Sequence, residues 1–104
     1  MAVYNTNMSD KNKIIKAIRD NTKEINAFGV KRIGLFGSYA GGRQNAGSDI
    51  DILIEFCAGE KGFDNYMELK FYLEKLFHRR IDLVIKDALK PGIRRNVLRN
   101  VIYA

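Results

Sequence analysis

The chain has 104 residues, 46% of them apolar, and a formal charge of +6, which predicts one small folded domain and excludes a disordered chain. No apolar run approaches the roughly 20 residues that a membrane-spanning helix needs, and MAVYNTNMSD lacks a signal-peptide pattern, so we expect no membrane association. Because the single cysteine, Cys57, cannot form an internal disulfide, we expect a cytoplasmic protein. The positive charge is compatible with binding to nucleic acid, to nucleotides or to an acidic protein, and it does not discriminate among these partners.

The N-terminal part of the chain predicts a loose segment followed by a helix. Residues 1–8 are polar and expected to be flexible, and residues 9–104 are expected to form a single domain. Ser9 is a candidate N-cap, and Gly29 is a natural helix stop. Four apolar residues recur between them at near-helical spacing: Ile14, Ile18, Ile25 and Phe28.

A strand and a glycine-rich turn follow this helix. The apolar-rich run Val30–Phe36 predicts a strand, which ends at Gly37. A short helix is expected from Ser38 to Gly42, and the polar residues from Arg43 to Ser48 predict a loop.

The run from Asp49 to Phe56 carries the clearest strand pattern in the chain. Its isoleucines alternate with polar residues, although Leu53 falls in the polar phase. Alternation predicts that the isoleucines face the core and that Asp49 and Asp51 share the opposite face.

The C-terminal half predicts a helix, a strand and a last helix. Apolar residues at helical spacing, beginning with Phe63, predict the first of these, and His78 is expected to cap its C-terminal end. The strand predicted from Arg80 to Lys86 places Asp82 in the same phase as the earlier aspartates. Pro91 suits the start of the last helix. The expected apolar stripe of that helix is Ile93, Val97, Val101 and Ile102. This order predicts an α/β or α+β domain with a small mixed sheet flanked by helices.

Two segments carry the residues from which chemistry can be inferred. A strand that ends in Gly37-Ser38 and enters a helix points free N–H groups and a hydroxyl at any phosphate in front of it. Asp49 and Asp51, joined by Asp82 if the two strands are neighbours, supply the hard oxygen ligands that Mg²⁺ prefers. Each feature also has a plain structural interpretation, as a turn and as an exposed polar strand face.

The spacing Gly37-Ser38, ten residues, Asp49-Ile50-Asp51 resembles the signature of the DNA polymerase β-like nucleotidyltransferases, and especially the minimal nucleotidyltransferases (MNT). The resemblance runs from about Ile14 to Tyr103. It implies transfer of a nucleoside monophosphate from a triphosphate, ATP, to a hydroxyl group, with two Mg²⁺ ions. Asp49, Asp51 and Asp82 would be the catalytic and metal-binding residues. Gly37, Ser38, Arg43 and Ser48 would bind the nucleotide.

The resemblance also implies a partner. Many MNT proteins are antitoxins that transfer AMP to a tyrosine of a HEPN-type ribonuclease toxin, so such a toxin, in a complex with this chain, is the expected acceptor. Alternatives are an antitoxin that neutralises by binding alone, or transfer to a small molecule or to RNA, with nucleic acid not preferred. Where the family commonly has arginine this chain has Gly41, and Arg43 is near enough in sequence to replace it.

Overall fold

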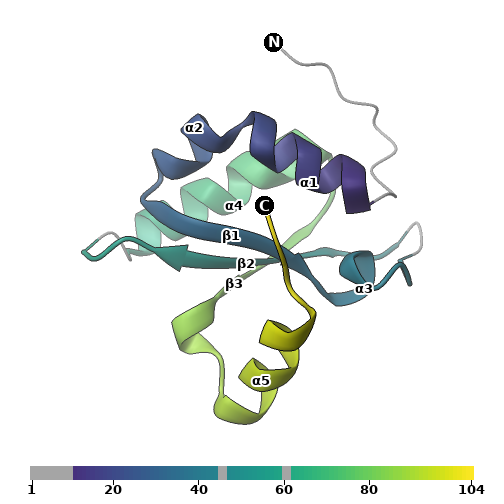
Figure 1. Cartoon of the computed structure of the whole chain (residues 1–104). Coiled ribbons are helices and arrows are strands. Elements are labelled where there is room, and N and C mark those ends of the chain that lie inside the picture. The colour runs from purple at the N-terminus through teal and green to yellow at the C-terminus, as the bar shows by residue number, and fades with distance from the viewer. Residues whose placement is uncertain (1–10, 45–46, 60–61) are drawn as a thin grey trace.

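A computed structural model describes residues 11–44, 47–59 and 62–104 of the chain. Four strands form one mixed sheet in the order β3-β2-β1-β4 (Figure 1). Their bounds are Val30–Phe36 for β1, Ile50–Phe56 for β2, Ile81–Ile85 for β3 and Ile102–Tyr103 for β4. β2 is antiparallel to β1 and parallel to β3, so the predicted small mixed sheet is confirmed.

Helices cover both faces of this sheet (Figure 1). One face carries α1 (Lys11–Asp20), α2 (Thr22–Asn26) and α4 (Phe63–Phe77), and the other carries α5 (Pro91–Asn100). The short helix α3 (Gly37–Ala40) directly follows β1, and a 3₁₀ helix, η1 (Lys86–Ala88), connects β3 to α5. None of the helices in the described ranges is both long and apolar enough to cross a membrane.

The main hydrophobic core lies between the sheet and the face that holds α1, α2 and α4. Helix α1 buries a stripe at helical spacing, and the isoleucines of β2 are fully buried, as their alternation predicts. Helix α4 closes this layer and is tied to β3, because the Tyr66 hydroxyl donates a hydrogen bond to the Leu83 carbonyl oxygen at 2.7 Å. The residues of the core that lie on the strands include Val30, Ile33, Leu35, Ile50, Ile52, Ile54, Ile81 and Leu83.

The first predicted helix is two helices, which meet at Asn21. The Asn21 side-chain amide donates to the Ala17 carbonyl at 2.7 Å, and the Thr22 hydroxyl donates to the Arg19 carbonyl at 2.7 Å. Such side chains compete with the regular helical pattern, which explains the break. The predicted cap, Ser9, lies outside the described residues.

Burial on the second sheet face differs from the prediction. Leu53 shares the phase of Asp51 but is fully buried, so the sheet face on the side of α5 is not a purely polar face (Figure 1). Within α5 only Val97 is buried, and Ile93, expected in its apolar stripe, is 56% exposed. On the other side of the sheet, Phe63, expected to begin the apolar stripe of α4, is also exposed.

The last helix ends earlier than predicted, and a fourth strand follows it. Val101 leaves the helix in an extended conformation, and Ile102 pairs with Leu35 of β1. Gly34 permits this close approach, because a Cβ at that position would lie 2.7 Å from a methyl carbon of Val101. The Ala104 N–H donates to the Ile33 carbonyl at 3.0 Å, so the chain end is part of the sheet.

Candidate functional site

Two of the three predicted aspartates are direct neighbours. Asp51 in β2 and Asp82 in β3 are register partners across the parallel strand pair. Asp51 is half-buried and Asp82 is exposed, so the pair opens toward solvent from the Asp82 side. The two strands are neighbours, so the condition for the predicted proximity of Asp82 and Asp51 is met.

The electrostatics of this pair are unfavourable in the absence of a cation. Burial is the largest cause that raises the pKa of Asp51 from 3.8 to about 6, followed by the charge of Asp82, a hydrogen bond with the Asp82 side chain, and the charge of Asp49. Each cause disfavours the ionised carboxylate. The site is therefore one in which a nearby positive charge would be strongly stabilised.

Asp49 is placed differently from the other two. It lies just before the first residue of β2 and is exposed, so the predicted strand begins one residue later than expected. In the described ranges no group of three His, Cys, Asp or Glu side chains is arranged to hold a metal ion. Asp49 acts on Asp51 through its charge but does not complete a preformed set of three ligands.

Gly37 brings the backbone of the turn after β1 against the Asp51 carboxylate. Phe36, the residue before it, is the register partner of Asp51 in β1. Gly37 has a φ of +71°, and a Cβ there would overlap the Oδ2 atom of Asp51. Only glycine meets both conditions, so the start of α3 and the aspartate pair form one continuous site. Ser38, next in the chain, is half-buried at the same place.

Arg43 folds back over the glycine-rich turn from Gly37 to Gly42. Its backbone N–H donates to the Ser38 carbonyl oxygen at 2.8 Å. Its guanidinium lies against the α-carbon of Gly41, where a Cβ would overlap the Nη1 atom. The cation thus occupies space that a side chain at position 41 would fill. Ser48, the last predicted nucleotide-binding residue, is half-buried and lines a cavity that also contains Asp49.

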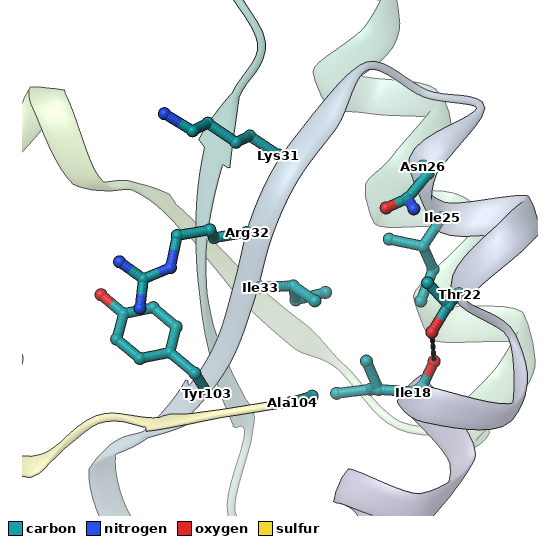
Figure 2. Close-up of a pocket in the computed structure, with 9 residues that line it drawn as sticks. All are labelled: Ile18, Thr22, Ile25, Asn26, Lys31, Arg32, Ile33, Tyr103 and Ala104. Atoms are coloured by element: carbon teal, nitrogen blue, oxygen red, sulfur yellow. Dashed lines mark hydrogen bonds between the residues drawn. The ribbon is translucent and has the colours of Figure 1, made fainter.

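A separate cavity of about 160 Å³ lies at the β4 side of the sheet, and no sequence pattern predicted it (Figure 2). It is lined from α1, α2, β1 and the chain end, and the Arg32 guanidinium stacks 3.7 Å from the centre of the Tyr103 ring beside it. No acidic side chain is among its described lining residues. With β2 and β3 on the other side of β1, this cavity is not part of the aspartate site.

The arrangement fits a divalent cation and a phosphorylated ligand. Mg²⁺ usually takes one or two carboxylates, keeps several waters and binds substrate phosphates at its remaining positions. The Asp51–Asp82 pair supplies two carboxylates, and the free N–H groups at the start of α3 lie directly beside them. Such a site can bind a nucleotide's phosphates and its metal together.

The sequence matches the family model described as a nucleotidyltransferase domain over residues 12–104. It is 47% identical over 76 residues to a protein adenylyltransferase, MntA, of Thermococcus cleftensis, and the match covers 73% of this chain and 76% of the relative.

Solved structures share the fold. One provisionally identified as a minimal nucleotidyltransferase superposes with a TM-score of 0.77 at 33% identity, covering 92% of this chain and 97% of that one. A toxin–antitoxin structure with AMP-PNP gives 0.65 at 30% identity, covering 89% and 70%. A complex of tri-AMPylated HEPN toxin with its MNT antitoxin, from Shewanella oneidensis, gives 0.56 at 27% identity, covering 89% and 66%.

Proposed function

The chain belongs to the nucleotidyltransferase domain family, and from this membership we propose that it transfers AMP from ATP to a tyrosine hydroxyl of a cognate HEPN-type toxin, for which it is the antitoxin. The 47% identity to MntA supports the adenylyl transfer. The AMP-PNP-containing and AMPylated toxin–antitoxin structures support the nucleotide and the partner. The observation that carries the proposal is the pairing of Asp51 with Asp82 beside Gly37.

The proposed metal ligands are Asp51 and Asp82, with Asp49 available from the residue before β2. Held by these carboxylates, Mg²⁺ would supply neutralisation of negative charge on the phosphates. The repulsion that raises the pKa of Asp51 would be relieved by a cation at this place. Two ions remain part of the proposal because the family resemblance implies them.

The nucleotide is held on the α3 side of the pair. The backbone N–H groups after Gly37 and the hydroxyl of Ser38 face the β- and γ-phosphates in this proposal, and Ser48 contributes from the other end of the loop. The Arg43 guanidinium, packed over Gly41, adds positive charge next to the same turn. Arg43 thereby takes the role that the family commonly gives to an arginine at position 41.

The acceptor approaches from the Asp82 side. The tyrosine oxygen attacks the α-phosphorus and its proton passes to a carboxylate oxygen of Asp82. The bond from the α-phosphorus to the oxygen bridging to the β-phosphate breaks, and pyrophosphate leaves with the electron pair. Holding the reactants in line and neutralising charge provide most of the rate enhancement.

The test combines the protein, Mg²⁺, ATP labelled at the α-phosphate and the HEPN protein encoded beside it. Wild-type protein should label the HEPN protein, whereas the double variant Asp51→Asn, Asp82→Asn should not. Lys23→Glu, on α2 at the far end of the sheet from α3 (Figure 1), is a control for a charge change remote from the site. No label with wild-type protein, with other nucleoside triphosphates also tried, contradicts the proposal.

An antitoxin that works by binding alone is the second candidate, because the chain is small and has Gly41 where the family commonly has arginine. In that case the double variant Asp51→Asn, Asp82→Asn would still inhibit the ribonuclease activity of the toxin at equal molar ratio. The reducing cytoplasm is the proposed site of action, because Cys57 has no second cysteine with which to pair.

A further inference from the structure

A positively charged loop lies beside the aspartate site and has no role in the proposed transfer of AMP. It consists of His78, Arg79 and Arg80, between α4 and β3, and is called the 78–80 loop. These three residues line a cavity of about 260 Å³ together with Gly47, Ser48 and Asp49. Arg80 is also fixed to the start of β2, because its carbonyl oxygen accepts the Ile50 N–H at 3.0 Å.

The first residue of the 78–80 loop, His78, has a backbone conformation that is unfavourable for most residues other than glycine. His78 is the C-cap of α4 with φ 54° and ψ 38°, a left-handed conformation that glycine adopts much more readily. Glu74 fixes the loop at both ends: its carbonyl accepts the His78 N–H at 2.9 Å, and its carboxylate accepts the Ile81 N–H at 3.4 Å. A non-glycine residue kept in this conformation beside a candidate active site points to a use for its side chain.

The sheet order places this loop on the acceptor side of the proposed reaction. Gly37 and α3 approach Asp51 from β1, whereas Asp82 and the 78–80 loop belong to β3, on the opposite side of β2. With the nucleotide's phosphates held at α3, the hydroxyl that attacks in line arrives from the β3 side. The 78–80 loop is then next to the polypeptide that carries the hydroxyl.

On this basis, and resting on the proposed function, we propose that the 78–80 loop recognises the acceptor protein by binding carboxylate side chains that flank the acceptor tyrosine. Guanidinium groups bind carboxylates through paired hydrogen bonds, so Arg79 and Arg80 supply suitable donors. Within the part of the chain that the structure describes, the side chains of His78 and Arg80 form no salt bridge. The carboxylate facing them is Asp49, which is itself a proposed metal ligand.

An acidic polypeptide fits this surface better than a nucleic acid does. Surfaces for single-stranded nucleic acid combine a positively charged groove with aromatic side chains on which the bases stack. The cavity at the 78–80 loop has no Phe, Tyr or Trp among the residues described as lining it.

The probes for the test are two labelled synthetic peptides, each with one tyrosine, flanked by glutamates in one and by glutamines in the other. Fluorescence anisotropy measures their binding to the full chain with Mg²⁺ and AMP-PNP, and mass spectrometry measures transfer of AMP from ATP. The variants are Arg79→Glu and Arg80→Glu, with Lys23→Glu as the charge-matched control. Calorimetry with AMP-PNP measures nucleotide binding separately, and an RNA oligonucleotide serves as competitor.

We expect wild-type protein to bind the glutamate peptide about fivefold more tightly than the glutamine peptide, with the difference reduced by salt. Arg80→Glu should remove this preference and favour a lysine-flanked peptide, while AMP-PNP binding stays unchanged. Equal binding of both peptides by wild-type protein overturns the inference. The inference is also overturned if Arg80→Glu weakens binding of AMP-PNP and leaves the peptide preference intact, or if the RNA oligonucleotide displaces the glutamate peptide. Glutamate-selective binding without AMP transfer would support the inference while contradicting the proposed activity on such peptides, so the two failures are distinguishable.

Discussion

Asp51 and Asp82 are register partners on two parallel strands, and burial together with the charge of Asp82 raises the pKa of Asp51. Adjacent carboxylates repel when both are ionised, so this pair lowers the stability of the metal-free protein at neutral pH. The site is therefore held in place by the buried strands around it and not by its own interactions.

Asp51→Asn should stabilise the metal-free protein in a pH-dependent way. The pKa of Asp51 is about 6 in the folded protein, and its ordinary value of 3.8 applies to the unfolded chain. As the pH rises, Asp51 therefore ionises in the unfolded chain at a lower pH than in the folded protein. The resulting destabilisation is absent below about pH 4, grows as the pH rises toward about 6 and is complete above it. After allowance for solvent screening, we expect a gain on the order of 1 kcal/mol above about pH 7. Urea unfolding with EDTA at low and at neutral pH measures it, with the exposed Glu68→Gln as control; an equal gain at low pH would contradict ionisation of Asp51 as the cause.

The three aspartates should differ in their effect on AMP transfer. Asp51→Asn and Asp82→Asn should each lower kcat by about 100-fold or more, because they remove the adjacent pair of ligands. Asp49→Asn should lower it less, since Asp49 is exposed and outside that pair. Initial rates of toxin labelling over a range of Mg²⁺ concentrations measure this order, and EDTA should abolish labelling. An Asp49→Asn loss as large as the other two would show that Asp49 joins the site when metal binds.

Gly37→Ala should damage both stability and activity. The new Cβ would meet the Asp51 carboxylate, and the φ of +71° is unfavourable for alanine, so we expect a loss of about 1–3 kcal/mol. Gly92→Ala in α5 is the control, because its Cβ would meet nothing and should add up to about 1 kcal/mol. Thermal unfolding compares the two variants, and similar unfolding temperatures would argue against the close contact at Gly37.

Gly41→Ala should act through Arg43. A Cβ at position 41 displaces the guanidinium that lies against it, so Gly41→Ala and Arg43→Ala should weaken ATP binding by similar factors. The double variant should be no weaker than either single one, because both remove the same contact. Calorimetric titration with AMP-PNP measures all three proteins. Additive losses would mean that Gly41 and Arg43 affect nucleotide binding independently.

His78→Gly should separate stability from acceptor recognition. Glycine adopts the left-handed conformation at the end of α4 without strain, so we expect a gain of about 1 kcal/mol in the free energy of unfolding. If the imidazole contributes to the 78–80 loop, the KM for the acceptor should rise at the same time while the KM for ATP is unchanged. A variant that is more stable and has an unchanged acceptor KM would assign His78 to the backbone turn alone.

Much of the fold followed from local patterns that tertiary packing does not override. The alternation around Ile50 and Ile52 predicted the central strand. Strand phase predicted that Asp82 shares a face with Asp51, but their proximity also required β2 and β3 to be neighbours, which the structure shows. Other features depend on contacts between distant segments. Leu53 is fully buried although it shares the strand phase of Asp51, and the two-residue strand β4 has too little sequence to carry a period.

The site shows the same division. The sequence spacing from Gly37 to Asp51 correctly indicated that the two residues belong to one site. They lie close together because β1 and β2 pair, with Phe36 opposite Asp51. The packing of Arg43 over Gly41 could not be derived from spacing, since it depends on the path of the chain after α3. His78 was correctly expected at the end of α4, but its left-handed backbone and its place beside Asp49 appear only in the folded chain.

The short strand β4 covers part of an edge of the sheet that would otherwise be unpaired. Through Ile102, Tyr103 and the Ala104 N–H it occupies part of the outer rim of β1, which would otherwise offer unpaired N–H and C=O groups to another molecule. Removing these residues exposes that rim, and pairing of two molecules through it becomes the favoured route to aggregation.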